Sequence, residues 1–489
     1  MRSVADGKDS SPGSYKLEEL RIEGKYGNID LNHIFSQISI LESIDSPFIT
    51  GNIAFIDAFN VFSNLPIVEG DKIKGKMTLP DSPEEDQFIR QFDEGELEFE
   101  YELYGVNHSL KMKQDIQMVN LPFCSSIWSD NMKGIVSQGF CQTPYISAAK
   151  QIFDEFLQKG GLQQKIKNKP LEIEQSDGLF NFIIPNWKPL DAIAWLLSRS
   201  KVGKAVNYKF FEDKDKFRLV TVEKLMSAGS KKTLYNVTPN MDTFDSKRVG
   251  GGVISPFNMS VMERRYNQCW ATSVGSSLNT NDASGYCMYG RRMITHDLTF
   301  KRVKDYYYKG VEAGNYKLDE PRDYMDDFND YTHLGGNEPL ILDMIAQEMG
   351  PKEGDDKLVM YPLQHHQWTG VEDNFKPEDW LRQYRAVRQH IHFYRASLQT
   401  YGKFSLKAGD VITVDWASPQ WTHMDKKQLD SRNNGDWLIV SLKRVFENAV
   451  DGHHMVLELA RNARTNKADH IWDQGQNEKY KGDRTSYGH

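Results

Sequence analysis

The chain has 489 residues, with 60 Lys and Arg against 68 Asp and Glu, and a net charge of −8. This length predicts about three domains, and the 39% of hydrophobic residues is enough to build packed cores. The acidic balance disfavours a protein that holds nucleic acid by general phosphate contacts, although it suits a conduit that DNA passes without adhering. No run of about 20 apolar residues predicts a membrane-spanning helix.

The first residues, MRSVADGKDSSPGSYK, are polar and lack the apolar core of a secretory signal. We therefore expect residues 1–14 to form a disordered N-terminal arm. The four cysteines contain no CxxC pair, so buried or incidental thiols are expected rather than a disulfide framework or a metal site. These cysteines are Cys124, Cys141, Cys269 and Cys287.

Residues 15–126 have the texture of β-structure. Their β-branched and aromatic runs are broken by Ser-Pro and Thr-Gly, which are turn signals. Residues 96–103 then alternate strictly, with apolar side chains on one face and glutamates on the other, which predicts a half-buried strand. We interpret the row of Glu96, Glu98, Glu100 and Glu102 as a solvated face rather than an ion site.

Residues 127–245 predict an α+β insertion domain with its own core. Apolar residues recur at helical spacing over 146–157, and a second helix is expected after Trp187, where Pro189 suits its first turn. The segment YKFFEDKDKFRLVTVE predicts a hairpin that turns at residues 213–215.

Residues 246–302 and 376–464 predict a second β domain, entered through a helix in PEDWLRQYRAVRQHI. Between these two stretches, residues 303–375 are rich in Tyr, Asp and Gly and are expected to be a long irregular elaboration. Tyr306, Tyr307 and Tyr308 in it are either interface anchors or neighbours of a core strand. Residues 465–489 are expected to be a polar tail.

The most informative feature is a pattern that occurs twice. Residues 65–80 (LPIVEGDKIKGKMTLP) and 404–419 (FSLKAGDVITVDWASP) share a Gly-Asp pair, a closing proline and apolar positions in step. Ile73 aligns with Ile412, and Met77 with Trp416. In both places a polar excursion and an alternating hairpin follow, from Asp71 to Tyr101 and from Asp410 to Ile439. The repeat predicts two copies of one small antiparallel β-barrel or sandwich, with Ile73 and Ile412 in equivalent buried positions.

No motif predicts catalysis or a cofactor. The histidine pairs 365–366, 390/392 and 453–454 lack a carboxylate or cysteine at ligand spacing, and His453 and His454 follow a turn where exposed polar residues are expected. Residues 249–253 (VGGGV) lack the Lys-Ser/Thr and the helix of a phosphate loop, so a hinge is the better interpretation. We therefore expect no catalytic, cofactor-binding or metal residues.

Several segments resemble the central baseplate hub of contractile-tailed phages of the T-even myophage type. The opening segment ISILESIDSPFITGNIAFIDAFNVFSNLPIVEGDKI is similar to the family's first tube-like barrel, and IIPNWKPLDAIAWLLSRS is similar to a helix of its α+β insertion. DWLRQYRAVRQ, LKAGDVITVDWASP and GDWLIVSLKRVF resemble its second barrel.

The resemblance implies a mainly β fold with two tube-like barrels and an α+β domain. It also implies a non-enzymatic homotrimer, in which six barrels meet the hexameric tail tube protein on one side and the three-fold central spike on the other. Other baseplate proteins are implied as neighbours, and genomic DNA is implied to pass the lumen without specific binding. The implied location is the virion tail baseplate, with assembly in the host cytoplasm as a late structural protein.

Two alternatives remain open. The chain is also compatible with the hub of another contractile injector, such as a secretion system or a bacteriocin. An enzyme is the other alternative, for instance a cell-wall or glycan hydrolase whose catalytic carboxylates the sequence cannot nominate among its 68 acidic residues.

Overall fold

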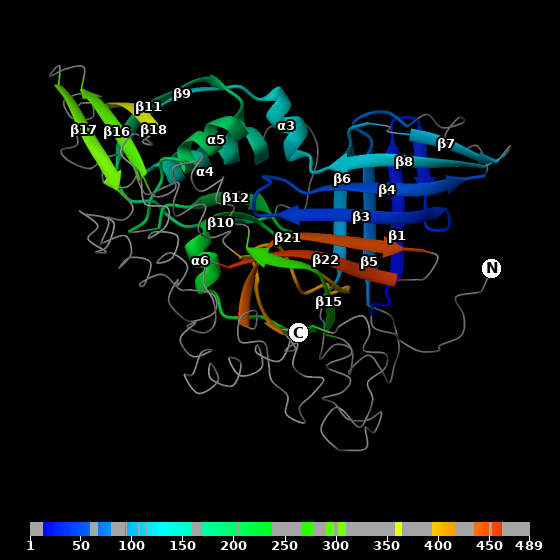
Figure 1. The fold of residues 1–489 in the computed structure, drawn as a ribbon. Helices are drawn as coiled ribbons and strands as arrows, with labels where there is room; N and C mark the ends of the chain where they lie inside the picture. Colours follow the sequence, from blue (N-terminus) through cyan, green and yellow to red (C-terminus); the bar gives the residue numbers. More distant parts are fainter. Residues whose placement is uncertain are drawn as a thin grey trace, which may run out of the picture.

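The protein is mainly β, with antiparallel pairing between most neighbouring strands, as the sequence predicts (Figure 1). In the part of the chain that is described, helices occur between residues 127 and 227. The structure is a computed structural model. It describes residues 13–58, 67–79, 93, 95–105, 108–113, 116–158, 169–203, 205–236, 267–276, 290–297, 302–309, 357–363, 394–416, 435–448 and 452–461.

The first half of the large sheet consists of the strands of residues 16–124. They are β1 (Lys16–Gly24), β2 (Gly27–Asp30), β3 (Phe35–Ser43), β4 (Thr50–Asp57), β5 (Lys72–Thr78), β6 (Leu97–Leu103), β7 (His108–Lys113) and β8 (Ile116–Cys124). Their order is β2-β1-β5-β6-β8-β4-β3. β4 pairs along one edge of β8, whereas β6 and then β7 follow each other along its other edge.

The alternation in β6 is confirmed, but its glutamates are not a simple solvated row. The apolar positions of β6 are buried in the first core. On the other face the lysines of β5 stand opposite the glutamates, with Lys72 3.0 Å and Lys74 3.5 Å from Glu100, and Lys76 3.3 Å from Glu96. Opposite charges on neighbouring strands form a cross-strand ladder. The sequence does not reveal this ladder, because the paired residues are 20 to 28 positions apart.

The insertion, residues 127–227, has a core of its own. Its first predicted helix is α4 (Tyr145–Ile152), which continues as the π-helix η1 (Phe153–Gln158), and its second is α5 (Pro189–Leu197). The predicted hairpin is formed by β12 (Tyr208–Glu212) and β13 (Phe217–Thr221). The remaining elements are α3 (Ile127–Lys133), β9 (Val136–Thr143), β10 (Leu171–Ile173), β11 (Phe180–Trp187) and α6 (Val222–Ser227).

The second half of the large sheet returns on itself. It consists of β14 (Thr233–Asn236), β15 (Gln268–Ser276), β19 (Tyr394–Tyr401), β20 (Val411–Asp415), β21 (Gly435–Glu447) and β22 (Gly452–Arg461). β21 pairs with β20, β20 with β14, β14 with β15, β15 with β19, β19 with β22, and β22 again with β21. β14 lies in the range predicted for the insertion, yet its partners belong to the second half.

A separate three-stranded sheet contains part of the region expected to be irregular. β17 (Arg302–Lys309) and β18 (Lys357–Leu363) pair with opposite edges of β16 (Gly290–Asp297), and Figure 1 shows this sheet at the upper left. Tyr306, Tyr307 and Tyr308 lie on β17. Their side chains, the predicted helix of residues 377–391, the VGGGV hinge and the polar tail lie outside what the structure describes.

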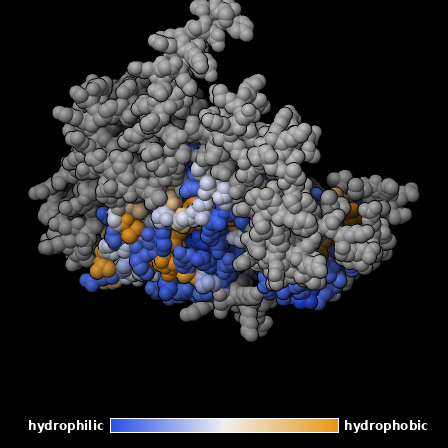
Figure 2. All heavy atoms as spheres, turned by 90° about the horizontal axis from the view of Figure 1, so that it is seen from below, coloured by the Kyte–Doolittle hydropathy of each residue, from blue (hydrophilic) through white to orange (hydrophobic). Residues whose placement is uncertain are grey.

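The end of the N-terminal arm contacts the second half. The Gly13 carbonyl accepts a hydrogen bond of 2.7 Å from the His453 N–H, and Ser14 forms a bridge with Gly452. In the described chain no helix is long and apolar enough to cross a membrane. On the face seen from below, the described surface is mostly hydrophilic, with smaller hydrophobic patches (Figure 2).

Strands of the first half have counterparts in the second half, in the same chain order. β1, β3, β4, β5, β6 and β8 correspond to β14, β15, β19, β20, β21 and β22. Each of the pairs β1–β5, β5–β6, β6–β8, β8–β4 and β4–β3 has its counterpart in β14–β20, β20–β21, β21–β22, β22–β19 and β19–β15. One direction differs, since β14 runs parallel to β20 whereas β1 runs antiparallel to β5. The agreement indicates two copies of one strand arrangement.

Ile73 and Ile412 are both fully buried, as the repeat predicts. We expect Ile73→Ala and Ile412→Ala each to lower the free energy of unfolding by about 2–5 kcal/mol, because each leaves a cavity in a packed core. Urea unfolding measures the loss. Ile183→Ala is the matched control, since Ile183 is 73% exposed and its loss should stay within about 0.5 kcal/mol. A loss of that small size at either buried position would contradict the equivalence.

Candidate functional site: two Gly-Asp turns at the junction of the halves

The first Gly-Asp turn is closed by four hydrogen bonds. The Asp71 carboxylate accepts from the Val68 N–H at 2.8 Å, and the Asp71 N–H donates back to the Val68 carbonyl at 3.2 Å. The Gly70 N–H donates to the Leu103 carbonyl at 2.7 Å, and the Leu103 N–H donates to the Asp71 carbonyl at 2.8 Å. Gly70 has φ +90°, a left-handed conformation that favours glycine.

The second turn repeats these bonds one for one. The Asp410 carboxylate accepts from the Lys407 N–H at 3.1 Å, and the Asp410 N–H returns a bond of 3.2 Å to Lys407. Gly409, with φ +82°, donates to the Ile439 carbonyl at 2.8 Å, and Ile439 donates to Asp410 at 2.9 Å. At both turns the aspartate carboxylate thus accepts from a nearby backbone amide, as is usual for aspartate in a tight turn. The residue equivalent to Ile439 is Leu103, two positions beyond Tyr101.

The second carboxylate oxygen ties each turn to the counterpart strands β1 and β14. Asp71 Oδ1 accepts from the N–H of Lys25, which directly follows β1, at 3.1 Å. Asp410 Oδ1 accepts from Nζ of Lys231, which stands just before β14, at 2.6 Å. β1 runs antiparallel to β5, whereas β14 runs parallel to β20. Lys25, after β1, and Lys231, before β14, therefore lie at equivalent ends of the two counterpart strands.

The two turns differ in what covers them. A Cβ added at Gly70 would meet no atom within 4 Å, whereas one at Gly409 would lie 3.1 Å from Cζ of Phe211 and 3.4 Å from Leu225. Phe211 and Leu225 belong to the insertion and share a core with Ala408 and Val411. The first turn is therefore open in the described structure, and the insertion packs on the second.

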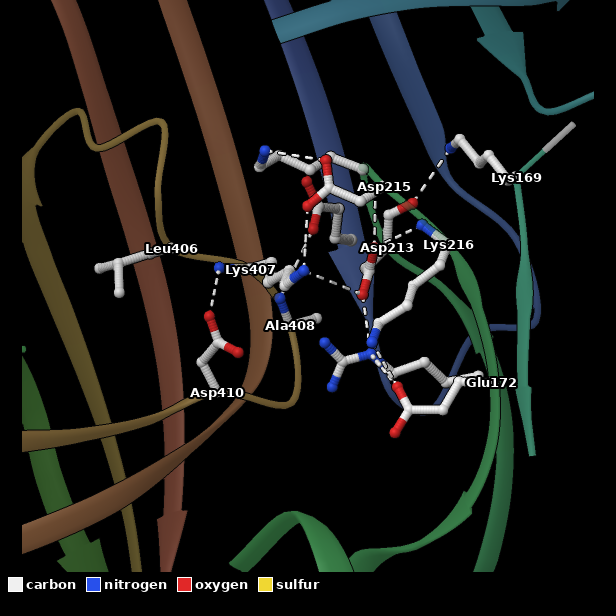
Figure 3. Close-up of polar contacts among 12 residues, drawn as sticks. Lys169, Glu172, Asp213, Asp215, Lys216, Leu406, Lys407, Ala408 and Asp410 are labelled. Carbon is white, nitrogen blue, oxygen red and sulfur yellow. Dashed lines mark hydrogen bonds and ion pairs between the residues drawn. The ribbon is translucent and has the colours of Figure 1, made fainter. Parts of the chain in front are cut away.

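Charges secure the insertion to the second turn (Figure 3). Lys407 Nζ lies 2.9 Å from Asp215 and 3.7 Å from Asp213, both in the turn of the β12–β13 hairpin. Burial acts to raise the pKa of Asp215, but the hydrogen bonds from Lys407 and Lys214 outweigh it and lower the pKa to about 2. Asp213 also accepts from Nε of Arg218 at 2.8 Å.

The same hairpin reaches the first half. Glu212 accepts a hydrogen bond of 3.2 Å from the Ile49 N–H, and Lys209 Nζ lies 2.6 Å from Asp45. Ile49 and Asp45 belong to the connection between β3 and β4. The hairpin is thus fixed to both halves at once.

The two halves also join directly, through antiparallel pairing of β3 with β21. In this pairing Arg444 and Glu42 form a fully buried ion pair with 3.1 Å between Nε and Oε1. Arg444 also donates to the carbonyl oxygens of Lys403 and Leu406. Burial raises the pKa of Glu42, against the opposing effect of Arg444.

A loop of the first half also reaches the second. Asp93 accepts hydrogen bonds from the N–H groups of Phe404, at 2.7 Å, and Ser405, at 3.0 Å, and from the Ser405 hydroxyl at 2.6 Å. Asp93 is buried. The segment that leads into the second turn is therefore held by Asp93 on one side and by Arg444 on the other.

His453 is buried, whereas the sequence predicts exposed residues at this turn. It is 2% exposed and stacks on Phe446, with ring centroids 4.1 Å apart. Burial lowers its pKa well below 6.5, and the charge of Arg444 adds to this effect. The pairs 365–366 and 390/392 lie outside the described residues. Within those residues, no three His, Cys, Asp or Glu are grouped so as to hold a metal ion.

Three of the four cysteines are described, and none of the three forms a disulfide. Cys124 and Cys269 are buried and Cys141 is exposed, whereas Cys287 lies outside the described residues. Burial raises the pKa of Cys124 to about 12. The junction residues, in contrast, carry no sequence motif. A signal for them lay in Arg444, a charged residue that interrupts the apolar pattern of β21.

No protein-family model and no curated protein matches the sequence. Solved structures similar to the chain are phage tail proteins and secretion-system proteins. The 43 kDa tail protein of prophage MuSo2 from Shewanella oneidensis is 9% identical, with a TM-score of 0.46 over 91% of this chain and 98% of that chain. The tail protein from Neisseria meningitidis MC58 is 8% identical, with a TM-score of 0.48 over 91% and 96%.

A third similar structure is an E. coli component of the type VI secretion system, itself described as similar to the T4 bacteriophage tail proteins gp27 and gp5. It is 8% identical, with a TM-score of 0.38 over 93% of this chain and 79% of that chain. By their descriptions, the first two neighbours are phage tail proteins and the third is a secretion-system component. At TM-scores below 0.5, none of them assigns a role to a residue of this chain.

The two turn glycines form a matched pair for mutation. Gly70→Ala and Gly409→Ala should each cost about 1–2 kcal/mol of unfolding free energy, because alanine is strained in the left-handed conformation. Gly409→Ala should cost more than Gly70→Ala, because its Cβ also presses on Phe211, which is fully buried. Urea unfolding compares the two. Equal losses would contradict the packing of the insertion on the second turn.

Lys403 gives the junction a pH dependence. Burial lowers its pKa from 10.5 to about 7, so between these values the unfolded chain binds a proton that the folded chain lacks. Stability should therefore rise with pH over this window, by up to about 1.4 kcal/mol per pH unit. Lys403→Met should remove that rise. Urea unfolding of both proteins at pH 7, 8 and 9 measures it, and parallel profiles would contradict it.

Proposed function

We propose that the protein is the baseplate hub of a contractile phage tail. In this role three chains form an adaptor ring between the six-fold tail tube and the three-fold central spike. The ring lines the passage through which DNA leaves the particle.

The observation that supports this proposal is the internal repeat. Two copies of one strand arrangement, with the same pairings and the same Gly-Asp turn, stand in one chain. We infer that each copy is one small barrel. The cyclic pairings of the second half favour this, and the first half is open where β3 leaves it to pair with β21. Three such chains place six similar copies around an axis, which reconciles a six-fold partner with a three-fold one.

The junction suits a ring that must resist mechanical force. Strand pairing, a buried ion pair and a hairpin fixed to both halves connect the two copies within each chain. Independent movement of the copies would have to break these contacts together. A rigid pair of copies keeps the pseudo-six-fold spacing that a tube ring requires.

The proposed partners follow from this role. They are two further copies of the chain, the hexameric tail tube protein, the central spike protein and other baseplate proteins. The net charge of −8 suits a lumen that DNA passes without specific binding. The proposed location is the virion tail baseplate, with assembly in the host cytoplasm late in infection.

A hub of another contractile injector would use the same geometry. Genes for a capsid and a portal beside the coding sequence favour the phage tail, whereas effector genes there favour a secretion system or a bacteriocin. The repeat supports both systems equally, and the two differ only in what the tube delivers.

The proposed role is structural and not enzymatic. Zymography on bacterial cell walls separates the two. A cleared zone that disappears when one acidic residue is replaced would favour a wall or glycan hydrolase and contradict the adaptor.

The proposal predicts a trimer. Size-exclusion chromatography with light scattering should give three times the 56.3 kDa of one chain, and projection images should show a three-fold ring with a central hole. A monomer or dimer at micromolar concentration would contradict it.

A further inference from the structure

The internal repeat implies a second strand junction that is not formed within the described chain. Within the chain, β3 of the first half pairs with β21 of the second. The counterpart of β3 is β15, and the counterpart of β21 is the consecutive pair β6 and β7. The same junction in its second version would therefore join β15 to β7, and no such pairing exists within the described chain.

The register along β8 and β22 matches β7 to the second part of β21. Leu103 stands opposite Phe123, as Ile439 stands opposite Leu459. His108 pairs with the residue three positions before Phe123 on β8, and Lys443 pairs with the residue three positions before Leu459 on β22. Ser109 is therefore the counterpart of Arg444.

The register through β4 and β19 matches β15 to β3. Gly51 of β4 pairs with Phe123 on one side and with Ile40 on the other. Ala396 of β19 pairs with Leu459 on one side and with Val274 on the other. Val274 is therefore the counterpart of Ile40.

Both edges are open in the described structure. β7 pairs with β8 alone, and β15 beyond Cys269 pairs with β19 alone. Ser273 and Val274 are exposed, Val274 to 38%. β7 lies at the upper right of Figure 1 and β15 at the lower centre, so these two strands do not pair with each other within the chain.

We propose that β15 of one chain adds antiparallel to β7 of a second copy, with Val274 opposite Ser109 as Ile40 stands opposite Arg444 within the chain. This inference rests on the proposed oligomeric hub and identifies the surface that builds it. The contact is head-to-tail, because it uses two different surfaces of each chain, and such contacts form a ring when the rotation closes. Main-chain hydrogen bonds between strands supply the affinity.

The two versions of the junction differ in charge. The version within the chain buries Arg444 against Glu42, whereas the counterpart positions between chains are Ser109 and Ser276 by register. Desolvating an ion pair is a cost that a folding chain offsets with many other contacts. Separate chains that meet from water avoid this cost when small neutral residues stand at these positions.

Cysteine cross-linking tests the register. Directly opposite residues on paired strands have Cβ atoms about 4.5–5.5 Å apart, close enough for a disulfide after small adjustments. The full chain carries Cys141→Ser and Cys287→Ser, with Ser109→Cys and Val274→Cys added. Under mild oxidation we expect a covalent trimer on a non-reducing gel. Chains with only Ser109→Cys, mixed with chains with only Val274→Cys, should give a covalent dimer.

The control pair is Leu110→Cys with Val274→Cys, because a shift of one residue turns the side chain to the other face of the strand. It should cross-link at least tenfold less. Equal cross-linking of both pairs, or a disulfide within one chain, would overturn the proposed register. A trimer by light scattering that does not cross-link overturns this strand pairing but leaves the hub, whereas a monomer contradicts the hub itself.

A charge at the edge gives a second, independent test. Val274→Lys places a charge on the strand edge, a device that blocks edge-to-edge pairing. We expect the mass by light scattering to fall from three chains to one, while the chain stays folded and unfolds cooperatively, because Val274 is partly exposed. The matched control is Ile183→Lys, at a 73% exposed position of the insertion, which should stay trimeric. A trimer with Val274→Lys would overturn the proposal.

Discussion

The buried guanidinium of Arg444 is the contact on which the arrangement of the two halves depends. It pairs with Glu42 across the β3–β21 junction and donates to the carbonyls of Lys403 and Leu406. A buried charge is tolerated only when its partners are in place. Arg444 therefore fixes the register of β21 on β3. It also fixes the path of the chain into the second Gly-Asp turn, so that the turn and the sheet depend on the same side chain.

The two copies share the geometry of the turn but differ in what covers it. Both turns keep the same hydrogen bonds, because in each a left-handed glycine and the aspartate next to it bond their own turn and the equivalent strand, β6 or β21. Their surroundings differ: the insertion covers Gly409, while Gly70 stays open in the described structure. Among the described residues, the insertion thus packs on the turn of the second copy and not on that of the first.

Local patterns predicted the elements well where they depend on neighbours in sequence. The strand at residues 97–103, the helix before η1 and the hairpin at 213–215 all follow from periodicity and turn residues. Three expectations left out partners that only the folded chain brings together. The glutamates of β6 face the lysines of β5, His453 is buried on Phe446, and β14 belongs to the second half. The loops between repeated strands also differ in length. The residue equivalent to Ile439 is for this reason Leu103 and not Tyr101, with which the sequence aligns it.

By itself, the sequence determined that the chain contains one strand entry twice, since Gly-Asp and the apolar residues in step with it act through local backbone geometry and burial. Ile73 and Ile412 are buried for that reason. Only the tertiary structure decided how the two copies meet. The pairing of β3 with β21, the burial of Arg444 and the open edges of β7 and β15 depend on registers between segments up to about 400 residues apart, and no local pattern encodes such a register.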